Sequence, residues 1–165
     1  IDAHPDITLP GDPYPGYHAM AVTACMGHGD AKIVAELPAA FDPSKILFVG
    51  LRNWERGEIK ARQHQYGIKH LTPEEVAADS DALRAWLKSC GASKVVVHFD
   101  MDVLDPAEIV AAVGTDPDGM KIEAVIRVIN DIAAEKELVG LTVAEPMPRT
   151  AIRLRDMLGR LPLLE

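Results

Sequence analysis

Aspartate and histidine alternate in two short stretches of this chain. The first stretch is Asp2-Ala3-His4-Pro5-Asp6, and the second is Asp100-Met101-Asp102. In an extended backbone, alternate side chains lie on the same face, so the polar residues of each stretch can converge on one point. We therefore expect each stretch to present its carboxylates, and the first stretch also its imidazole, to a common ligand.

These side chains are suitable ligands for a divalent metal ion. Four carboxylates and one imidazole form a hard set of oxygen donors with one nitrogen, which suits Mn²⁺ or Mg²⁺ better than a zinc ion held by thiolates. Carboxylates that bridge two such ions would let them share a water and lower its pKa, so that hydroxide forms near neutral pH. A lone Asp-x-Asp after a strand is more often a structural cap of a turn or helix. The two motifs together, each at the end of a predicted strand, favour a metal site.

Short apolar runs rich in β-branched residues predict the strands that would position these motifs. They cover residues 46–50, 94–99 and 138–143, and a weaker candidate covers 67–71. Strands of this kind are usually buried on both faces of a parallel sheet. Ligands of such sheets gather beyond the carboxyl ends of the strands, which is where the second Asp stretch lies.

Helices are predicted between the strands. Thr72-Pro73-Glu74-Glu75 is a capping box with proline at the first helical position, and Ser80 is placed to cap a second helix. Apolar residues at helical spacing predict a third helix over residues 121–135, and further helices are expected at 18–26 and 150–158. The alternating order predicts an α/β fold with a parallel sheet and helices on both of its faces.

The composition is that of an ordinary globular chain and fits a single domain over residues 1–165. Hydrophobic residues make up 48% and charged residues 25% of the sequence, which allows a sizeable core. The formal net charge of −8 argues against nucleic acid as a partner, because no Lys/Arg stripe is present to offset phosphates. No apolar run approaches the roughly 18 residues of a membrane span, and no signal peptide opens the chain. Cys25 and Cys90 form no Cys-x-x-Cys pattern, so we expect buried free thiols and a cytoplasmic protein.

The two Asp motifs together resemble those of a known enzyme family. Asp-Ala-His-x-Asp, followed much later by a strand that ends in Phe-Asp-x-Asp-x-Leu-Asp-Pro, is similar to the pattern of the arginase, agmatinase and formimidoylglutamase family. The resemblance runs through the whole chain. It implies a three-layer α/β/α fold, a centre of two Mn²⁺ ions, and hydrolysis of the guanidino or formimino group of a small cationic substrate. Family members commonly form trimers or hexamers, so a homo-oligomer is expected.

The resemblance also implies a role for each metal ligand. Asp2 and Asp100 would bridge the two metals. Asp6 would bind one metal, and His4 and Asp102 would bind the other.

Three further positions match the family around the metals. His18, in Gly-Tyr-His-Ala, matches its histidine proton shuttle, and Glu145 matches the glutamate that grips the substrate guanidinium. Gly114-Thr115 stands where the family has a Gly-Thr beside the pocket. Without the resemblance, these residues are a histidine at a helix start, a surface glutamate at a strand end and a simple loop.

Some expected features depart from the family pattern. The family takes one more metal ligand from a histidine in a Gly-Gly-Asp-His motif, which this sequence does not contain. Only Ile1 precedes the first Asp motif where a strand is expected, so we expect that the fold's first strands and this ligand lie in an upstream segment. The remaining histidines are interpreted as structural or solvent-exposed; they are His28, His64, His70 and His98.

The segments around the substrate also differ. Arginases carry an Asn and a Ser after the position of Asp6, and neither occurs in residues 7–15. Asn53-Trp54-Glu55 stands where arginases have Asp-x-Asp, and Pro146 follows Glu145. These differences count against arginine and leave agmatine, guanidino acids or a formimino compound as substrates.

Three functions follow from these observations. The leading one is a binuclear manganese hydrolase that cleaves a non-peptide C–N bond of a linear amidine. A metal-dependent hydrolase of another amide or ester would use the same ions. The third is a non-catalytic chain with a binding or assembly role, which the absence of the Gly-Gly-Asp-His motif favours.

Overall fold

The computed structural model describes residues 1–147 and 151–164. The chain divides into two compact units. The first unit comprises Ile1–Ala3, Val49–Arg52 and His70–Glu165, and the second comprises His4–Phe48 and Asn53–Lys69. Each unit is considered by itself below, and the single domain expected from the sequence stays a prediction.

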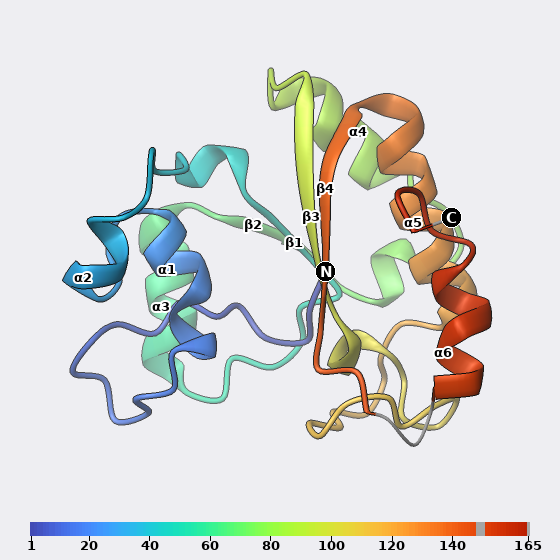
Figure 1. Cartoon of the computed structure of the whole chain (residues 1–165), viewed down its shortest axis with the longest axis horizontal. Coiled ribbons are helices and arrows are strands. Elements are labelled where there is room, and N and C mark those ends of the chain that lie inside the picture. Colours follow the sequence, from blue (N-terminus) through green and yellow to red (C-terminus); the bar gives the residue numbers. More distant parts are fainter. Residues whose placement is uncertain (148–150, 165) are drawn as a thin grey trace. The chain divides into compact units, whose positions relative to one another are not determined.

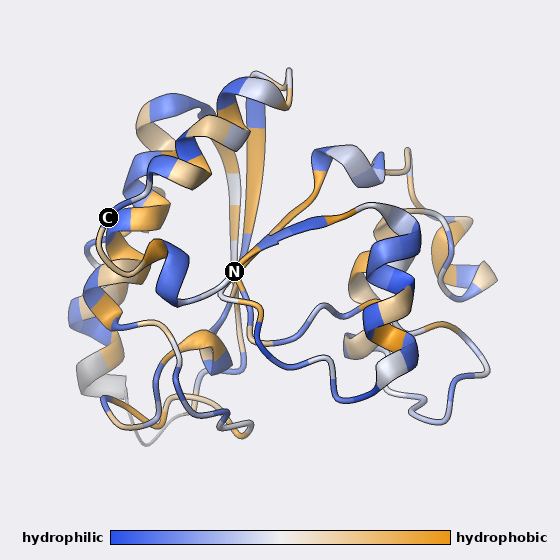
Figure 2. Cartoon of the chain, turned by 180° about the vertical axis from the view of Figure 1, so that it is seen from behind, coloured by the Kyte–Doolittle hydropathy of each residue, from blue (hydrophilic) through white to orange (hydrophobic). Residues whose placement is uncertain are grey.

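The sheet of the first unit consists of two parallel strands that lie side by side (Figure 1). Strand β3 (Lys94–Asp100) and strand β4 (Glu137–Ala144) pair along their whole length, with one irregularity in the register between Val95 and Val96. Both predicted strands are therefore confirmed, and each is slightly longer than expected. Figure 2 shows the hydrophobic run of β3 that the sequence pattern identified.

Helices of the first unit bury one apolar face each. Helix α4 (Asp81–Ser89) buries Leu83 and Leu87, and helix α5 (Ile122–Glu135) packs against α4 and β4. Helix α6 (Ala151–Leu158) follows β4 in the chain. The predicted helix at residues 150–158 is confirmed from 151 onwards, and residue 150 lies outside the described residues. The buried residues of α5 are Ala124, Val125, Ile126, Val128, Ile129 and Ile132.

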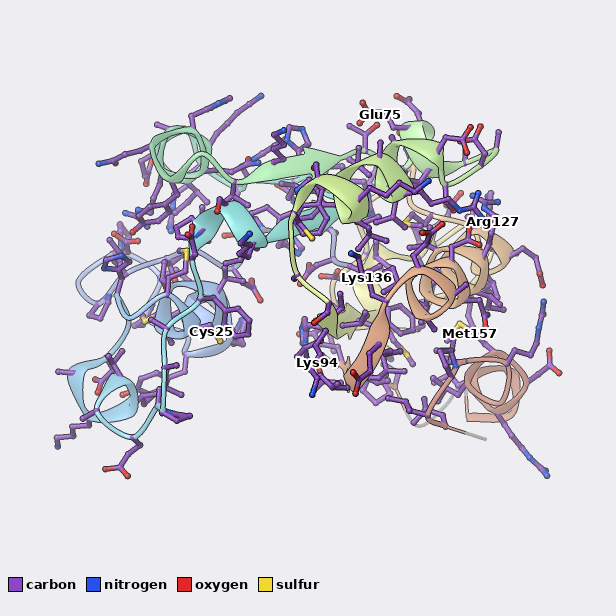
Figure 3. The ribbon with its side chains drawn as sticks, turned by 90° about the horizontal axis from the view of Figure 1, so that it is seen from above. Cys25, Glu75, Lys94, Arg127, Lys136 and Met157 are labelled. Carbon is purple, nitrogen blue, oxygen red and sulfur yellow. The ribbon has the colours of Figure 1, made fainter. Side chains whose placement is uncertain are left out.

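Of the two helix caps predicted in the segment before α4, the structure shows one. Thr72 N–H donates to Glu75 Oε2 at 2.8 Å, and Glu75 N–H donates to Thr72 Oγ1 at 3.3 Å, which confirms the capping box. The helix that follows is a single 3-10 turn, η3 (Glu74–Val76). Ser80 precedes α4, but the prediction that its side chain caps the helix is wrong. Its hydroxyl instead accepts a hydrogen bond at 3.4 Å from Arg127 of α5, a residue labelled in Figure 3.

Two short strands form a second two-stranded sheet. They are β1 (Leu47–Val49) and β2 (Lys69–Leu71), which correspond to the predicted runs at 46–50 and 67–71. The chain passes between the two units within these strands. Among the described residues the four strands therefore form two separate pairs.

The first two residues connect to strand ends of the first unit. The Ile1 nitrogen donates to the His98 carbonyl at 2.8 Å, and Asp100 N–H donates to the Ile1 carbonyl at 2.9 Å. Asp2 N–H donates to the carbonyl of Val49, the last residue of β1, at 3.0 Å. This backbone pairing places Asp2 next to the end of β3.

The second unit contains several short helices and one longer helix. The predicted helix at 18–26 is observed as a 3-10 turn, η1 (His18–Met20), and helix α1 (Ala21–Cys25). Helix α3 (Gly57–Tyr66) is the longest helix of this unit. Two more short elements complete the unit, α2 (Ala31–Val34) and η2 (Pro43–Lys45).

The two cysteines differ in exposure. Cys90 is buried, as expected, whereas Cys25 is exposed at the end of α1, so the expectation of a buried thiol there is wrong (Figure 3). The structure describes no helix long and apolar enough to cross a membrane.

Candidate metal centre

The candidate metal centre begins where β3 ends. Asp100 is the last residue of the strand, and the chain then enters a 3-10 turn, η4 (Met101–Val103). Asp100 Oδ1 accepts a hydrogen bond from Asp102 N–H at 3.0 Å, which caps this turn. The sequence argument assumed an extended backbone here, so its geometry was wrong. The two carboxylates nevertheless converge because the turn brings them together, and they are only 8% and 6% exposed.

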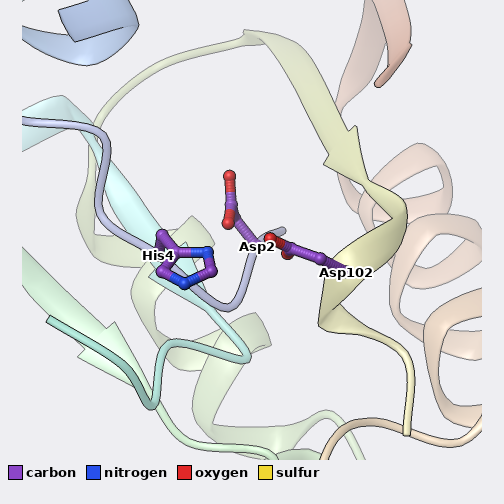
Figure 4. A group of neighbouring side chains, drawn as sticks. All are labelled: Asp2, His4 and Asp102. Atoms are coloured by element: carbon purple, nitrogen blue, oxygen red, sulfur yellow. The ribbon is translucent and has the colours of Figure 1, made fainter. Parts of the chain in front are cut away.

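Asp2 adds a third buried carboxylate. It is 8% exposed, and the neighbouring Ala3 N–H donates to Asp102 Oδ1 at 3.1 Å. Figure 4 draws Asp2 and Asp102 with their carboxylates near each other. The start of the chain and the turn after β3 therefore come together through backbone and side-chain bonds.

Glu145 lies at the same end of the sheet, directly after β4. One carboxylate oxygen from each of Asp100, Asp102 and Glu145 lies within 4.8 Å of the others. Parallel strands end at the same edge, which explains how residues from β3 and β4 meet. The backbone of Glu145 is left-handed, with φ of 57°, a conformation that costs energy for a residue other than glycine and is common at functional sites.

His98 forms a second group with the same carboxylates. A ring nitrogen of His98 and one oxygen from each of Asp2 and Asp100 lie within 4.8 Å of one another. His98 Nδ1 is hydrogen-bonded to Thr142 Oγ1 of β4 at 2.7 Å. Burial lowers the pKa of the His98 imidazole below its ordinary value. The sequence interpretation counted His98 as structural or exposed, and the residue as a whole is exposed in the structure. Its position two residues before Asp100 on one strand places both on one face.

Arg52 binds the backbone around the Asp102 turn. Its guanidinium donates to the carbonyls of Asp102 at 3.0 Å and Val103 at 3.2 Å. It also reaches Asp116 O at 2.8 Å, Pro117 O at 3.0 Å and, more weakly, Gly50 O at 3.4 Å. Burial lowers the pKa of this guanidinium. Arg52 thus joins the end of β1, the turn after β3 and the loop that contains residues 116–117.

Close packing and backbone conformation require a glycine at position 50 of this centre, and a second glycine, Gly114, lies beside Asp102. Gly50 has φ of +86°, and a Cβ there would clash with Val103 Cγ2. A Cβ at Gly114 would lie 3.6 Å from Asp102 Oδ2. Gly114, of the Gly114-Thr115 pair that was expected beside the pocket, therefore lies next to the carboxylate of Asp102, a candidate metal ligand.

The remaining predicted site residues belong to the second unit. His4 is its first residue and is half-buried. Asp6 has a left-handed backbone, with φ of 48°, so the extended alternation assumed from the sequence does not continue through it. His18 is exposed on η1, and its Nε2 is 3.1 Å from Tyr14 Oη.

The donor set of the first unit fits a hard divalent cation. Three buried carboxylates, those of Asp2, Asp100 and Asp102, lie at one place, and like charges so close disfavour one another unless a cation offsets them. Carboxylate oxygens with an imidazole nitrogen match the preference of Mn²⁺ among common protein metals. The described residues contain no thiolate in any such group.

Comparisons with known proteins agree with this geometry. The model of the arginase family matches residues 1–156. The arginase of Entamoeba histolytica is 28% identical over 154 residues, which cover 90% of this chain and 51% of that protein. This chain therefore spans about half the length of the curated relatives it matches.

Solved structures show the same fold. The Entamoeba histolytica arginase in complex with L-ornithine superimposes with a TM-score of 0.86 at 22% identity, covering 97% of this chain and 57% of that one. The Bacillus cereus arginase gives a TM-score of 0.83 at 21% identity, covering 97% and 59%. The predicted three-layer α/β fold is confirmed by these likenesses.

Proposed function

Because the chain belongs to the arginase family, we propose that it carries a centre for two Mn²⁺ ions and hydrolyses a non-peptide C–N bond of a linear amidine. The observation that supports this most directly is the convergence of Asp100, Asp102 and Glu145 within 4.8 Å at the carboxyl ends of β3 and β4. By the family pattern, Asp2 and Asp100 would hold both ions. Asp6 would hold one of them, and His4 and Asp102 would hold the other.

Each residue outside the ligand set has a distinct task in this proposal. When bound, the ions supply Lewis acidity that makes water nucleophilic at neutral pH. Glu145 pairs with the substrate guanidinium through two parallel hydrogen bonds, which holds the carbon in position for attack. His18 accepts a proton and delivers it to the leaving amine, since histidine exchanges protons near neutral pH.

The loop after Asp6 supports a substrate other than arginine. The hydroxyl of Thr8 donates to the Ala19 carbonyl at 2.7 Å, and Thr8 is only 3% exposed. Asp12 is held by Arg62 in a pair of hydrogen bonds of 2.6 and 3.1 Å. These polar groups are engaged within the second unit, so they do not replace the Asn and Ser that arginases carry. The candidate substrates are therefore agmatine, guanidino acids or a formimino compound.

The test combines metal content with product release. The purified chain is incubated with Mn²⁺, desalted, analysed for manganese and assayed with arginine, agmatine, guanidino acids and formimino compounds. We expect close to two ions per chain and release of urea, or of formamide from formimino substrates. Asp100→Asn should remove both metal and activity, whereas Asp118→Asn, which changes an exposed aspartate, should keep them.

Other outcomes point to the alternatives. Manganese without turnover would support the non-catalytic role. Acetate or phosphate release from other esters would support the second hydrolase. The expected homo-oligomer and cytoplasmic location stay predictions, to be checked by light scattering and by fractionation of cells.

A further inference from the structure

We propose that His98 is a nitrogen ligand of the metal centre, on the side where Asp2 and Asp100 meet. This inference rests on the proposed metal centre and adds to it a residue that none of the matched motif positions includes. It assigns a chemical role to an imidazole that the sequence interpretation left aside.

The backbone places the three side chains around one point. His98 and Asp100 are alternate residues of β3, so they share a face of the strand. Ile1 is hydrogen-bonded to the backbone of both residues, at 2.8 and 2.9 Å, and this holds Asp2 beside them. The position of the group therefore depends on main-chain pairing rather than on flexible side chains alone.

The separation of the ligand atoms suits a single ion. The nitrogen and the two oxygens lie within 4.8 Å of one another. Two ligand atoms on opposite sides of an ion, each at about 2.1 Å, are about 4.2 Å apart. The three atoms are therefore close enough to one another to be considered as ligands of one ion.

Thr142 orients the imidazole for this role. His98 and Thr142 are partners in the register of β3 and β4, and Nδ1 is 2.7 Å from Thr142 Oγ1. A histidine that binds a metal through one ring nitrogen usually forms a hydrogen bond through the other, which sets the tautomer and the ring plane. With Nδ1 engaged, Nε2 is the nitrogen that binds the ion.

An added imidazole has a measurable consequence for metal choice. Nitrogen ligands favour Mn²⁺ over the strictly oxygen-binding Mg²⁺. Loss of the His98 imidazole should therefore weaken the binding of Mn²⁺ more than the binding of Mg²⁺. If His98 only supported the shape of the site, its loss would weaken the binding of both ions alike.

The experiment uses the full 165-residue chain and its His98→Ala variant, with Mn²⁺ and Mg²⁺ titrated separately by calorimetry. The His64→Ala variant is the matched control, because His64 is exposed on α3 in the second unit. Chain labelled with ¹⁵N-histidine is also loaded with Mn²⁺, and the nitrogen couplings are measured by pulsed EPR. Thr142→Val tests the orienting hydrogen bond.

We expect His98→Ala to weaken Mn²⁺ binding by more than about 10-fold, with a smaller loss for Thr142→Val. It should also remove one histidine coupling, and His64→Ala should change neither affinity nor couplings. Unchanged affinity and couplings in His98→Ala, with two ions still bound to the starting protein, would overturn this inference and leave the proposed function intact. Absence of Mn²⁺ binding by the starting protein would overturn both.

Discussion

Ala3 N–H donates a hydrogen bond to Asp102 Oδ1 at 3.1 Å, although the two residues are 99 positions apart in the chain. The bond joins the first Asp motif to the second. It also satisfies one oxygen of a carboxylate that is only 6% exposed. A buried carboxylate held in this way is already positioned before any ion binds, which lowers the cost of assembling a metal site.

Asp102→Asn should separate metal binding from folding. The amide oxygen of asparagine can still accept the bond from Ala3, while one negative charge near Asp2 and Asp100 is removed. We expect the metal-free variant to be at least as stable as the parent chain. With Mn²⁺ at about 100 times its dissociation constant, the parent should gain about 2.7 kcal/mol and the variant much less. Thermal unfolding with chelator and with Mn²⁺ measures both effects.

Asp118→Asn is the control for that comparison. Asp118 is exposed and has φ of 59°, a conformation that asparagine tolerates as well as aspartate. It should behave as the parent chain under both conditions. A metal-free Asp102→Asn variant that is clearly less stable than the parent would contradict the charge argument.

Arg52→Lys should destabilise the first unit. The guanidinium donates to five backbone carbonyls, and a lysine ammonium cannot reproduce that planar fork. We expect a loss of about 2–4 kcal/mol in the free energy of unfolding, because several part-buried carbonyls lose their donors. Urea denaturation measures it, and Mn²⁺ affinity should fall as the Asp102 turn loosens.

Arg160→Lys is the matched control for Arg52→Lys. Its guanidinium pairs with exposed Glu123, so the same substitution should lower the free energy of unfolding by less. Equal denaturation midpoints for the two variants would show that the carbonyls around Arg52 contribute nothing special to stability.

Glu145→Gln should strongly reduce turnover without removing metal. Glutamine keeps the size of the side chain but cannot pair with a guanidinium as a charged acceptor. We expect kcat/KM to fall by roughly 30-fold or more, which corresponds to about 2 kcal/mol, while the manganese content stays the same. Elemental analysis measures the manganese content, and the activity assay measures kcat/KM. Loss of an ion would instead make Glu145 a metal ligand, which its position near Asp100 and Asp102 also allows.

The Asp12–Arg62 pair should make stability depend on pH in the acid range. The hydrogen bond from Arg62 lowers the pKa of Asp12 below its ordinary value of 3.8. The pair's stabilisation is therefore fully present above that value and is lost as pH falls through the lower, folded-state pKa. Asp12→Asn should lower stability near neutral pH by about 1–3 kcal/mol, and less in acid.

Denaturant unfolding of the parent chain and Asp12→Asn at neutral pH and near pH 3 tests this. Glu36→Gln, which changes an exposed carboxylate of the same unit, controls for general acid effects. A difference between Asp12→Asn and the parent that is the same at both pH values would count against the pair as the cause.

The strands and the second Asp motif were predictable because their causes are local. The run from Lys94 to Phe99 is apolar and β-branched, which predicts a buried strand, and Asp100 follows it directly. The helix over Ile122–Glu135 was predictable because its apolar residues repeat at helical spacing. The assumption of extended backbone failed at Asp102, which lies in a 3-10 turn, and at Asp6, whose φ is positive, because the backbone there depends on contacts that the pattern does not contain.

The sequence by itself determined the donor types, their place after strands and the resemblance to the arginase family. The tertiary structure alone decided which of these donors meet. Asp2 reaches Asp102, Arg52 reaches the carbonyls of that turn, and His98 joins Asp2 and Asp100. The physical reason is that each contact depends on which strands pair and in which register. A shift of one residue would turn every side chain of a strand to its other face.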